Sequence, residues 1–397
     1  MKVNKEVVIV GGARTAFGKF GGSLKNFTAT ELGVFAVKGA MERSGVKPAD
    51  IDHTVFGNAS QTSADAIYLA RHVALKAGVP QEKPALTLNR LCGSGFESII
   101  EGARQILIGE SDVVLCGGTE SMSQSPFVVR GTRFGVNLGQ NVKYEDQLWE
   151  ALTDPFCGFS MAQTAENLAD RLKISRMDCD LYAYLSQMRA KDAILGGRLK
   201  EEIVPVELKS RKGIKMFDTD EHPRPETTVE ALSTLPPYFK KDGTISAGNA
   251  SGICDGAAAV IVTTAEKAKA MGWKPLGRLI SWGHAGVEPS VMGIGPVPSS
   301  KMALKDAGMT IKDINVVEIN EAFAPQYLAV EKELGLDREI TNVNGGAIAL
   351  GHPLAASGTR LTLTTLLELR RRKQKVGLAS ACIGGGQGVA VVVECLS

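Results

Sequence analysis

The 397-residue sequence lacks most of the features that mark specialised classes of protein. Its formal net charge is only +2, whereas a nucleic-acid-binding protein normally carries a large basic excess. No apolar run reaches the ~18 residues that a membrane-spanning helix needs. The amino terminus shows no basic start, apolar stretch and cleavage site of the kind that directs secretion. We therefore expect a protein that binds neither nucleic acid nor membrane, and we expect it in the cytoplasm.

Paired metal-binding or disulfide-forming residues are also scarce. The seven cysteines are widely spread and include no CxxC pair, and the five histidines include no HxxxH pair. This spacing favours neither a disulfide framework nor a zinc site, so we expect free thiols and no metal. A GxGxxG fingerprint is absent as well, which argues against a nucleotide-dependent dehydrogenase. Glycine, in contrast, is abundant at 44 residues, which predicts many close backbone approaches.

The chain contains an internal repeat. "SGVKPADIDHTVFGN" from Ser44 aligns with "AGMTIKDINVVEIN" from Ala307, and Gly45 meets Gly308 at a shift of 308 − 45 = 263. "LCGSG" aligns with "LAASG" at the same shift, and the match holds without a gap over about 70 residues. A constant shift of this length predicts two similar halves.

Each half alternates β-branched runs closed by glycine, such as "EVVIVGG", with segments of helical periodicity, which predicts an α/β fold with buried strands. Between the halves lies a region with a long helical stretch, residues 164–194, and a charged, proline-rich segment. We therefore expect an N-terminal half made of residues 1–120 plus 250–272. An inserted loop domain should occupy residues 121–249, and the C-terminal half residues 273–397.

Three residues in glycine-rich surroundings are candidates for chemistry. Cys92 lies in "NRLCGSGFES" before a predicted helix, whose N-terminal dipole favours negative charge. Cys382 lies in "SACIGGGQG" after a predicted strand, and His352 lies in "ALGHPLAASG". The repeat pairs Cys92 with Ala355, three residues from His352, so the two loops should meet. A thiolate beside a base is a strong nucleophile, although each residue taken alone is compatible with a structural role.

Four segments together resemble the signature segments of the thiolases: "NRLCGSGFESI", "EINEAFAPQYLAV", "NVNGGAIALGHPLAASGTR" and "CIGGGQGVAVVVE". The resemblance covers essentially the whole chain. It implies the thiolase fold, a duplicated α-β-α-β-α five-layered core with an inserted loop domain, in agreement with the repeat. It also implies an acetyl-CoA C-acetyltransferase that makes or cleaves acetoacetyl-CoA, and longer 3-oxoacyl-CoA, by a ping-pong mechanism. A medium- or long-chain 3-ketoacyl-CoA thiolase of fatty-acid β-oxidation is the alternative.

The resemblance also implies roles for individual residues. Cys92 is the acylated nucleophile, His352 accepts its proton, and Cys382 is the acid and base at carbon. His352 and a water held by Asn320 form one oxyanion hole, and the backbone N–H groups of Cys92 and Gly384 form the other. Coenzyme A is a substrate, and no tightly bound cofactor is implied. The resemblance also implies which residues contact coenzyme A: Arg224 at the adenine end, Ser251 near the pantetheine, and Phe239, Ala250, Ala322 and Phe323 along the pocket.

One position departs from part of the family. Ser160 precedes the methionine of "MAQTAEN", where many acetoacetyl-CoA-specific relatives have histidine, so the chain length of the substrate stays open. The β-ketoacyl synthases share the fold but lack the second catalytic cysteine, which argues against that class. A non-catalytic, thiolase-like lipid carrier is disfavoured because the reactive residues are present together. Relatives are dimers or tetramers, so we expect a homodimer or homotetramer.

Overall fold

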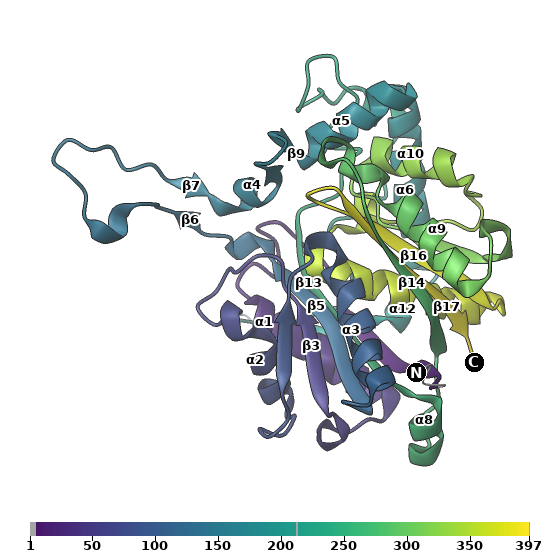
Figure 1. The fold of residues 1–397 in the computed structure, drawn as a ribbon. Helices are drawn as coiled ribbons and strands as arrows, with labels where there is room; N and C mark the ends of the chain where they lie inside the picture. The colour runs from purple at the N-terminus through teal and green to yellow at the C-terminus, as the bar shows by residue number, and fades with distance from the viewer. Residues whose placement is uncertain (1–4, 212, 397) are drawn as a thin grey trace.

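The computed structural model describes residues 5–211 and 213–396, and a long β-sheet runs through its centre (Figure 1). In spatial order the strands of the sheet are β15 (Val316–Ile319), β16 (Val376–Ile383), β17 (Gln387–Cys395), β14 (Gly277–Gly286), β1 (Val7–Thr15), β13 (Cys254–Thr264), β5 (Val113–Ser121), β3 (His53–Gly57) and β4 (Ala85–Leu88). The strands of the two halves join where β1 pairs with β14 through Val8 and Ile9. Two short strands pair with the ends of central strands: β2 (Gly18–Lys19) with β13 and β10 (Ile203–Val204) with β1.

Helices form three layers around the two parts of this sheet. α1 (Ala29–Ser44) and α2 (Leu69–Ala77) cover the outer face of the N-terminal strands. α9 (Pro296–Ala307) covers the C-terminal strands, with α10 (Ala324–Leu334) beside it. α3 (Ser94–Ile108) and α12 (Leu354–Arg372) lie between the two parts of the sheet and contact each other. The five layers expected from the sequence are therefore present.

Both faces of the central strands are buried, which explains their continuous apolar runs. Along β1, Val8 and Val10 face the cluster formed with α1 and α2. Val7 and Ile9 point the other way, into the cluster that surrounds α3 and α12. Alternate residues of a strand point to opposite faces, so an alternating polar pattern would leave one of these cores incomplete.

The predicted repeat is present as a shared register. β3 and β5 pair in parallel, with His53 opposite Val114. Adding 263 to both numbers gives Val316 and Gly377, which are also opposite each other in the parallel pair of β15 and β16. The two halves therefore agree residue for residue in this part of the sheet, as the constant sequence shift predicts.

The two central helices approach most closely at a pair of equivalent glycines. A Cβ atom on Gly95 would lie 2.5 Å from the backbone nitrogen of Thr359, and one on Gly358 would lie 2.3 Å from that of Phe96. The Thr359 hydroxyl donates to the Gly95 carbonyl oxygen at 3.0 Å. Only glycine permits this contact, which places the N-terminal ends of α3 and α12 side by side.

The region between the halves differs from the expectation in one respect. The helical stretch at residues 164–194 is two helices, α5 (Met161–Leu172) and α6 (Arg176–Leu195). Lys173 ends α5 at a φ of 54°, and the Ser175 hydroxyl accepts a hydrogen bond from the Asp178 N–H at the start of α6. Ser175 and Asp178 form a capping box, a helix-start signal that outweighs the continuous periodicity.

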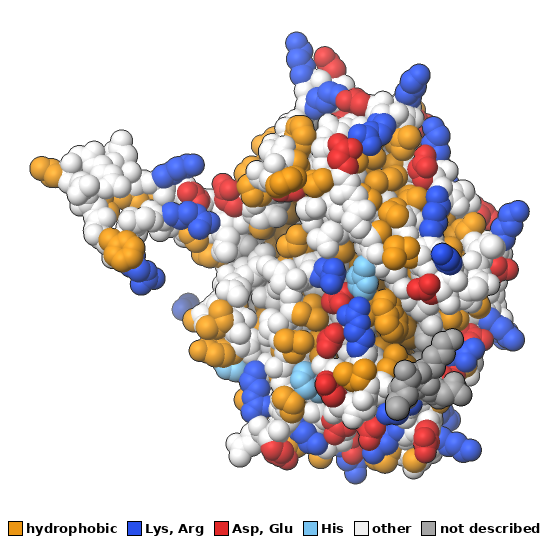
Figure 2. Space-filling view, viewed as in Figure 1, with side chains coloured by type: hydrophobic (Ala, Val, Ile, Leu, Met, Phe, Trp, Pro, Cys, Tyr) orange, Lys and Arg blue, Asp and Glu red, His pale blue; other side chains and the backbone are white. Residues whose placement is uncertain are grey.

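A narrow arm leaves the body of the protein within this region (Figures 1 and 2). It departs at β6 (Phe127–Val128) and returns at β7 (Glu145–Asp146), and α4 (Gln147–Ala151) follows at its root. The remaining elements are β8 (Thr153–Asp154), β9 (Phe159–Ser160), β11 (Val206–Ser210), β12 (Gly213–Phe217), α7 (Val229–Ser233), α8 (Ala265–Met271) and α11 (Ala347–Leu350). Within the described residues, no helix has both the length and the apolar composition that crossing a membrane requires.

Candidate active site

Cys92 lies in a tight turn, Leu91–Gly93, that leads directly into α3. Leu91 has a φ of 48°, which is uncommon for a residue with a side chain, and its N–H donates to Asn89 Oδ1 at 2.8 Å. The free N–H groups of the first turn of α3 favour negative charge at this end of the helix. The sequence-based placement of Cys92 at a helix start is therefore confirmed.

The Cys92 thiol keeps its proton in the resting protein. Burial raises its pKa to about 12, and the negative charge of Glu120 acts in the same direction. The backbone N–H groups of Gly384 and of Cys92 itself face the sulfur and act in the opposite direction. The nucleophile therefore needs a base, and two N–H donors already surround the atom that would carry an acyl group.

His352 lies between α11 and α12, and its ring is held at both nitrogens. Nδ1 is 2.6 Å from the Ser357 hydroxyl, which also reaches the Pro353 carbonyl oxygen at 3.4 Å. Since that carbonyl can only accept, we assign the hydroxyl proton to it and the ring proton to Nδ1. Nε2 then carries a lone pair and accepts from Asn320 Nδ2 at 3.3 Å. Burial, followed by the positive charge of Arg360, lowers the His352 pKa to about 3, so the ring is neutral.

Asn320 follows directly on β15, and its N–H donates to the Ser380 carbonyl oxygen at 2.9 Å. Its Oδ1 is buried and has no hydrogen-bond partner among the described residues. Buried amide oxygens normally have a partner, so this atom is suited to accept a hydrogen bond from a water or a substrate. Asn320 and His352 together present a polar corner to the site.

Cys382 is buried near the end of β16, directly before the glycine turn to β17. Burial raises the pKa of its thiol well above the ordinary value, and the negative charge of an ionised Cys92 adds to the shift. The two thiols are close enough to interact electrostatically, and Cys92 packs in a cluster with Leu354, two residues after His352, so the Cys92 and His352 loops meet as the sequence predicted. Gly385 and Gly386 in the turn have φ values of 81° and 83°, which only glycine adopts readily.

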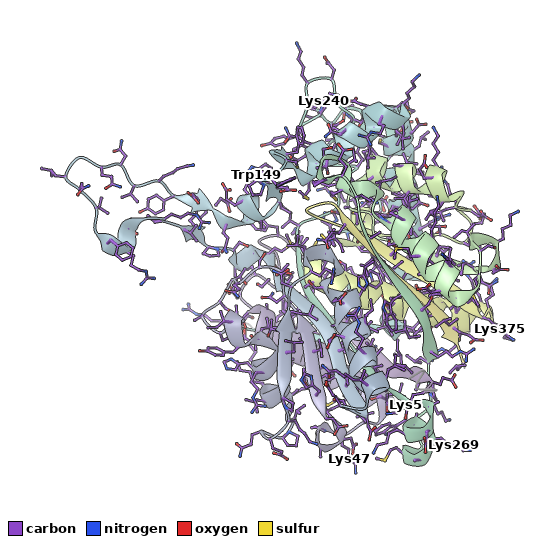
Figure 3. The ribbon with its side chains drawn as sticks, in the orientation of Figure 1. Lys5, Lys47, Trp149, Lys240, Lys269 and Lys375 are labelled. Atoms are coloured by element: carbon purple, nitrogen blue, oxygen red, sulfur yellow. The ribbon has the colours of Figure 1, made fainter. Side chains whose placement is uncertain are left out.

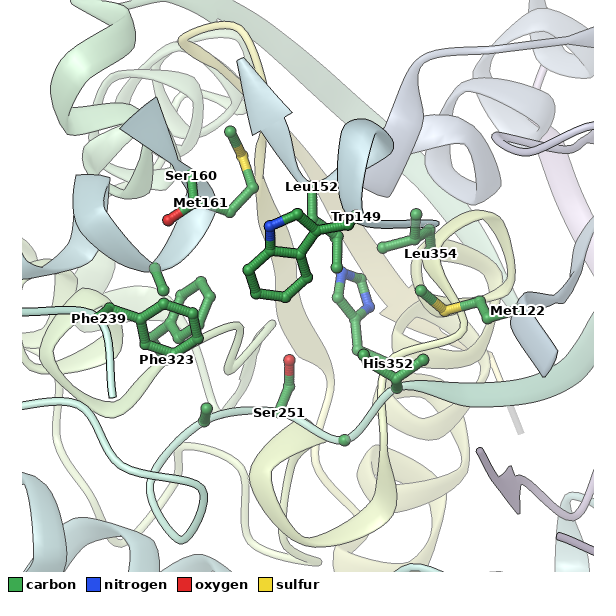
Figure 4. A pocket seen from close by; sticks show the side chains of 14 residues that line it. Met122, Trp149, Leu152, Ser160, Met161, Phe239, Ser251, Phe323, His352 and Leu354 are labelled. Atoms are coloured by element: carbon green, nitrogen blue, oxygen red, sulfur yellow. The ribbon is translucent and has the colours of Figure 1, made fainter. Parts of the chain in front are cut away.

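His352 lines an apolar pocket (Figure 4), and both thiols pack against other residues of its wall, Cys92 in a cluster with Leu354 and Cys382 in a cluster with Phe323. Met122, Leu354 and His352 line one side of it, and Phe239 and Phe323 line the other. The pocket suits the apolar part of a ligand, because its walls offer few polar atoms. In the part of the chain that the structure describes, no group of three or more His, Cys, Asp or Glu side chains is arranged to hold a metal.

Two further cavities extend the pocket toward the surface. Trp149 and Phe239 line both the pocket and the second cavity. Leu235 and Ala247 line both the second cavity and the third, which contains Arg224. The path therefore runs from an apolar end at His352 to a cationic end at Arg224, which suits a long ligand with an anionic head.

The residues expected to contact coenzyme A lie along this path. Ala250, Ser251, Phe239 and Phe323 line the pocket itself. Ala322 is buried behind it, where its carbonyl oxygen accepts from the Ser251 N–H at 2.9 Å.

Sequence reasoning missed two residues beside this site. Trp149 stands at the root of the arm, on α4, and reaches into the pocket (Figures 3 and 4). Its ring lies almost parallel to that of Phe239, with centroids 6.3 Å apart. Glu120 is fully buried at the end of β5 and accepts four hydrogen bonds. Trp149 lies in no glycine-rich motif. Glu120 follows the glycine pair of "VVLCGGTES", and an acidic residue within a buried strand is itself a signal of a polar network.

Comparison with known proteins identifies the family. The thiolase N-terminal domain matches residues 7–266, and the thiolase C-terminal domain matches residues 273–395. The chain therefore belongs to the thiolase family, whose members are acyltransferases. It is 55% identical, over 99% of each chain, to the mitochondrial 3-ketoacyl-CoA thiolase of Homo sapiens. It is 46% identical to the acetyl-CoA acetyltransferase of Syntrophomonas wolfei, over 99% of this chain and 100% of the relative.

Comparison with solved structures leads to the same family. The human mitochondrial 3-ketoacyl-CoA thiolase in complex with CoA superposes with a TM-score of 0.97 at 54% identity, covering 100% of both chains. The thiolase fold and the membership of the thiolase family expected from the sequence are confirmed. The thiolase activity is confirmed as well, and of the two specificities considered, the relatives favour the 3-ketoacyl-CoA thiolase over the acetyl-CoA acetyltransferase.

The expected cytoplasmic location is wrong. Relatives from human, orangutan and cattle that are 55% identical to this chain are all named mitochondrial. The expectation rested on the absence of features of secreted and membrane proteins. Such an absence does not distinguish one intracellular compartment from another, which is why the inference failed.

Proposed function

We propose that this protein is a 3-ketoacyl-CoA thiolase that cleaves medium- and long-chain 3-oxoacyl-CoA in fatty-acid oxidation. One observation carries the proposal: neutral His352 lies in the wall of an apolar pocket, and Cys92 and Cys382 pack against other residues of that wall. The 55% identity to a protein of that name supports the choice of substrate, as does Ser160 at the position where many acetoacetyl-CoA-specific relatives have histidine. Acetoacetyl-CoA is the second candidate substrate, supported by the 46% identity to an acetyl-CoA acetyltransferase.

In the first half-reaction Cys92 acquires the acyl group. His352 Nε2 takes the thiol proton, and the Cys92 thiolate attacks the C3 carbonyl of 3-oxoacyl-CoA. The C2–C3 bond then breaks, the shortened acyl group stays on the sulfur, and acetyl-CoA leaves as its enolate. The Cys382 thiol donates the proton that converts this enolate to acetyl-CoA, which leaves Cys382 as a thiolate.

In the second half-reaction free CoA completes the cycle. Its thiol gives a proton to the Cys382 thiolate, and its sulfur attacks the acyl-Cys92 thioester. The products are an acyl-CoA two carbons shorter and a Cys92 thiolate, which recovers its proton from His352. Each proton taken in the first half-reaction is therefore returned in the second.

Both half-reactions develop negative charge on oxygen, and we assign donors to each. The N–H groups of Cys92 and Gly384, which face the Cys92 sulfur, stabilise the oxyanion of the acyl group bound there. Asn320 and His352, with a water on Asn320, stabilise the enolate oxygen of acetyl-CoA. The acyl group and the acetyl-CoA enolate, which separate when the C2–C3 bond breaks, thus each have their own oxyanion site.

We assign coenzyme A to the path between the pocket and Arg224. The pantetheine arm passes Phe239, Ala250 and Ser251, and the nucleotide lies near Arg224, whose guanidinium suits phosphate groups. Residues 121–249 then act as a loop domain that covers this path, between an N-terminal half of residues 1–120 plus 250–272 and a C-terminal half of residues 273–397. A relative solved with CoA supports the choice of ligand.

We further propose a homodimer or homotetramer. β4 is the last strand of the sheet, so its outer edge carries unpaired backbone groups, and Leu86 within it is 40% exposed. Phe134 and Leu138 on the arm are 94% and 107% exposed, which is unfavourable for an arm that remains in water. A second copy of the chain would cover both features, and light scattering coupled to size exclusion measures the resulting mass.

A series of substrates tests the proposed specificity. We expect CoA-dependent cleavage of 3-oxobutanoyl-CoA, 3-oxooctanoyl-CoA and 3-oxohexadecanoyl-CoA, with higher kcat/KM for the two longer substrates. Activity confined to 3-oxobutanoyl-CoA would favour the acetyl-CoA acetyltransferase instead. No cleavage of any of the three would contradict the proposed function as a whole.

A further inference from the structure

Glu120 links the loops that carry the two reactive groups. Its carboxylate is fully buried at the end of β5, and both oxygens accept two hydrogen bonds. Oε1 accepts from Asn58 Nδ2 at 3.0 Å and from the Ser60 N–H at 2.9 Å. Oε2 accepts from the N–H groups of Ala59 and Ala355, both at 3.1 Å. An ionised carboxylate has about four acceptor positions, and here all four are used.

One of these bonds begins a chain that ends beside Cys92. The carbonyl oxygen of Ala59 accepts from Asn89 Nδ2 at 3.1 Å. Asn89 Oδ1 in turn accepts from the Leu91 N–H at 2.8 Å. Leu91 is the residue with the positive φ of 48°, a conformation that persists only where neighbouring contacts hold it. The position of the nucleophile turn therefore depends on Asn89 and, through Ala59, on Glu120.

The same oxygen of Glu120 holds the His352 loop. Ala355 lies in the first turn of α12, three residues after His352, and its N–H is one of the donors to Oε2. Gly118, two residues before Glu120 on β5, approaches the same place so closely that a Cβ atom on it would lie 1.9 Å from the Ala355 carbonyl oxygen. This end of β5 is thus fixed against the start of α12.

We propose that Glu120 is a positioning residue that sets the distance between the Cys92 turn and the His352 loop. Oε2 is shared between the Ala59 and Ala355 N–H groups, which belong to the two halves of the molecule, so one atom fixes both loops relative to each other. The proposal depends on thiolase chemistry at Cys92 but not on the acyl chain length.

Opposing effects act on the ionised form of Glu120: burial disfavours it, and the hydrogen-bond donors favour it. Burial raises the pKa of Glu120 to about 7, while the donors Ser60, Ala59 and Ala355 lower it and Asp255 raises it. A proton on either oxygen would displace one of the four donors, so the bridge requires the ionised form. The negative charge also adds to the effect of burial in raising the pKa of the Cys92 thiol.

Two substitutions separate the effect of the side-chain length of Glu120 from the effect of its charge. Glu120→Asp keeps the charge but shortens the side chain by one methylene, and Glu120→Gln keeps the length but replaces one acceptor oxygen by a donor. We expect both to lower kcat for thiolysis by about 10- to 100-fold, because small displacements of reacting groups have effects of this size. KM for CoA should change less than about threefold, since Glu120 does not line the CoA path. The rate at which iodoacetamide alkylates Cys92, measured by peptide mapping, should fall in parallel with kcat.

Asp52→Asn is the matched control. Asp52 Oδ2 accepts the N–H groups of Asp112 and Val113 at the opposite end of β5, far from the pocket. This variant should lose stability, measured by thermal unfolding, while kcat and the alkylation rate stay at parent values. Normal kcat in Glu120→Asp combined with reduced kcat in Glu120→Gln would show that charge alone matters and would overturn the bridging role.

Asn89→Ala tests the same link without disturbing the core, because Asn89 is exposed. It should fold as the parent does and reduce kcat and the alkylation rate of Cys92 by about tenfold, again with KM for CoA nearly unchanged. This result would support the bridge even if the Glu120 variants do not fold. Parent kcat and parent alkylation in Asn89→Ala would overturn it, and absent turnover in the parent would instead contradict the proposed function.

Discussion

The two halves of the molecule share a strand register but differ where they approach the active site. Residues 85–88 of the first half form the edge strand β4, whereas the equivalent residues 348–351 of the second half fall in and just after α11. At the shift of 263, Asn89 corresponds to His352 and Cys92 to Ala355. In the proposed mechanism, the first half therefore supplies the nucleophile and the second half supplies the base.

This difference shows how a duplicated scaffold can carry unequal chemistry. The Gly95–Gly358 contact brings the starts of α3 and α12 together, and with them the loops that lead into these two helices. Two identical loops would deliver two thiols or two imidazoles. The proposed mechanism needs one thiol and one imidazole from these two loops, and the exchange of strand for helix before His352 provides a different setting for the base.

Removing the base should cause the largest loss of activity among the substitutions considered. His352→Ala takes away the proton acceptor and one donor to the enolate oxygen, and loss of a single such donor lowers the rate on the order of 10²–10³-fold. We therefore expect at least this loss in kcat, measured by CoA-dependent thiolysis. His53→Ala, at the start of β3, is the control and should retain parent activity. If kcat of the His352→Ala variant stays within a few-fold of the parent value, the histidine is structural.

The second prediction separates the two thiols. Cys382→Ser should still accept an acetyl group on Cys92 but should lose condensation by about 10²-fold or more, because a hydroxyl is far less acidic than a thiol of pKa about 8.5. Exchange of solvent deuterium into the methyl group of acetyl-CoA should fall in parallel. The equivalent residue of the first half is Thr119, which donates to the Ala29 carbonyl oxygen, and Thr119→Ser should leave both steps intact. Failure of Cys382→Ser to acylate, with exchange preserved, would reverse the two roles.

The third prediction concerns the contact that joins the halves. Gly95→Ala and Gly358→Ala each place a Cβ atom within 2.5 Å of the backbone of the other helix. Overpacking of this kind lowers the free energy of unfolding by about 1–3 kcal/mol, and the two variants should lose similar amounts. Gly286→Ala, where the added Cβ meets nothing within 4 Å, is the control for chemical denaturation. A loss in only one of the two variants would show that the crossing is not symmetric.

The smallest effect should come from a residue that belongs to neither half. Trp149 is carried by the insertion, so Trp149→Ala should leave acylation of Cys92 unchanged and widen the pocket. We expect kcat/KM for 3-oxohexadecanoyl-CoA to rise relative to 3-oxobutanoyl-CoA by about tenfold, near the lower end of what a pocket contact supplies. Trp149→Phe, which keeps an aromatic ring, should fall between parent and alanine. An unchanged ratio would remove Trp149 from the determinants of chain length.

Much of this comparison was predictable from the sequence. The repeat, the buried strands and the meeting of the Cys92 and His352 loops followed from a constant shift, and the glycine-rich motifs marked Cys92, His352 and Cys382 as candidates. The break between α5 and α6 was missed because continuous periodicity concealed the Ser175 cap. Trp149 and Glu120 were missed for a different reason: their roles depend on contacts with distant segments, such as Phe239 and Ala355, and local sequence does not encode those contacts.

The central claim is that Cys92 of the first half carries the acyl group, while His352 and Cys382 of the second half transfer the protons. Intact mass after brief mixing with acetyl-CoA, followed by peptide mapping, tests it most directly. The account predicts one acetyl group per chain, located on the peptide that contains Cys92. An acetyl group on Cys382, or turnover with Cys92 unmodified, would contradict it.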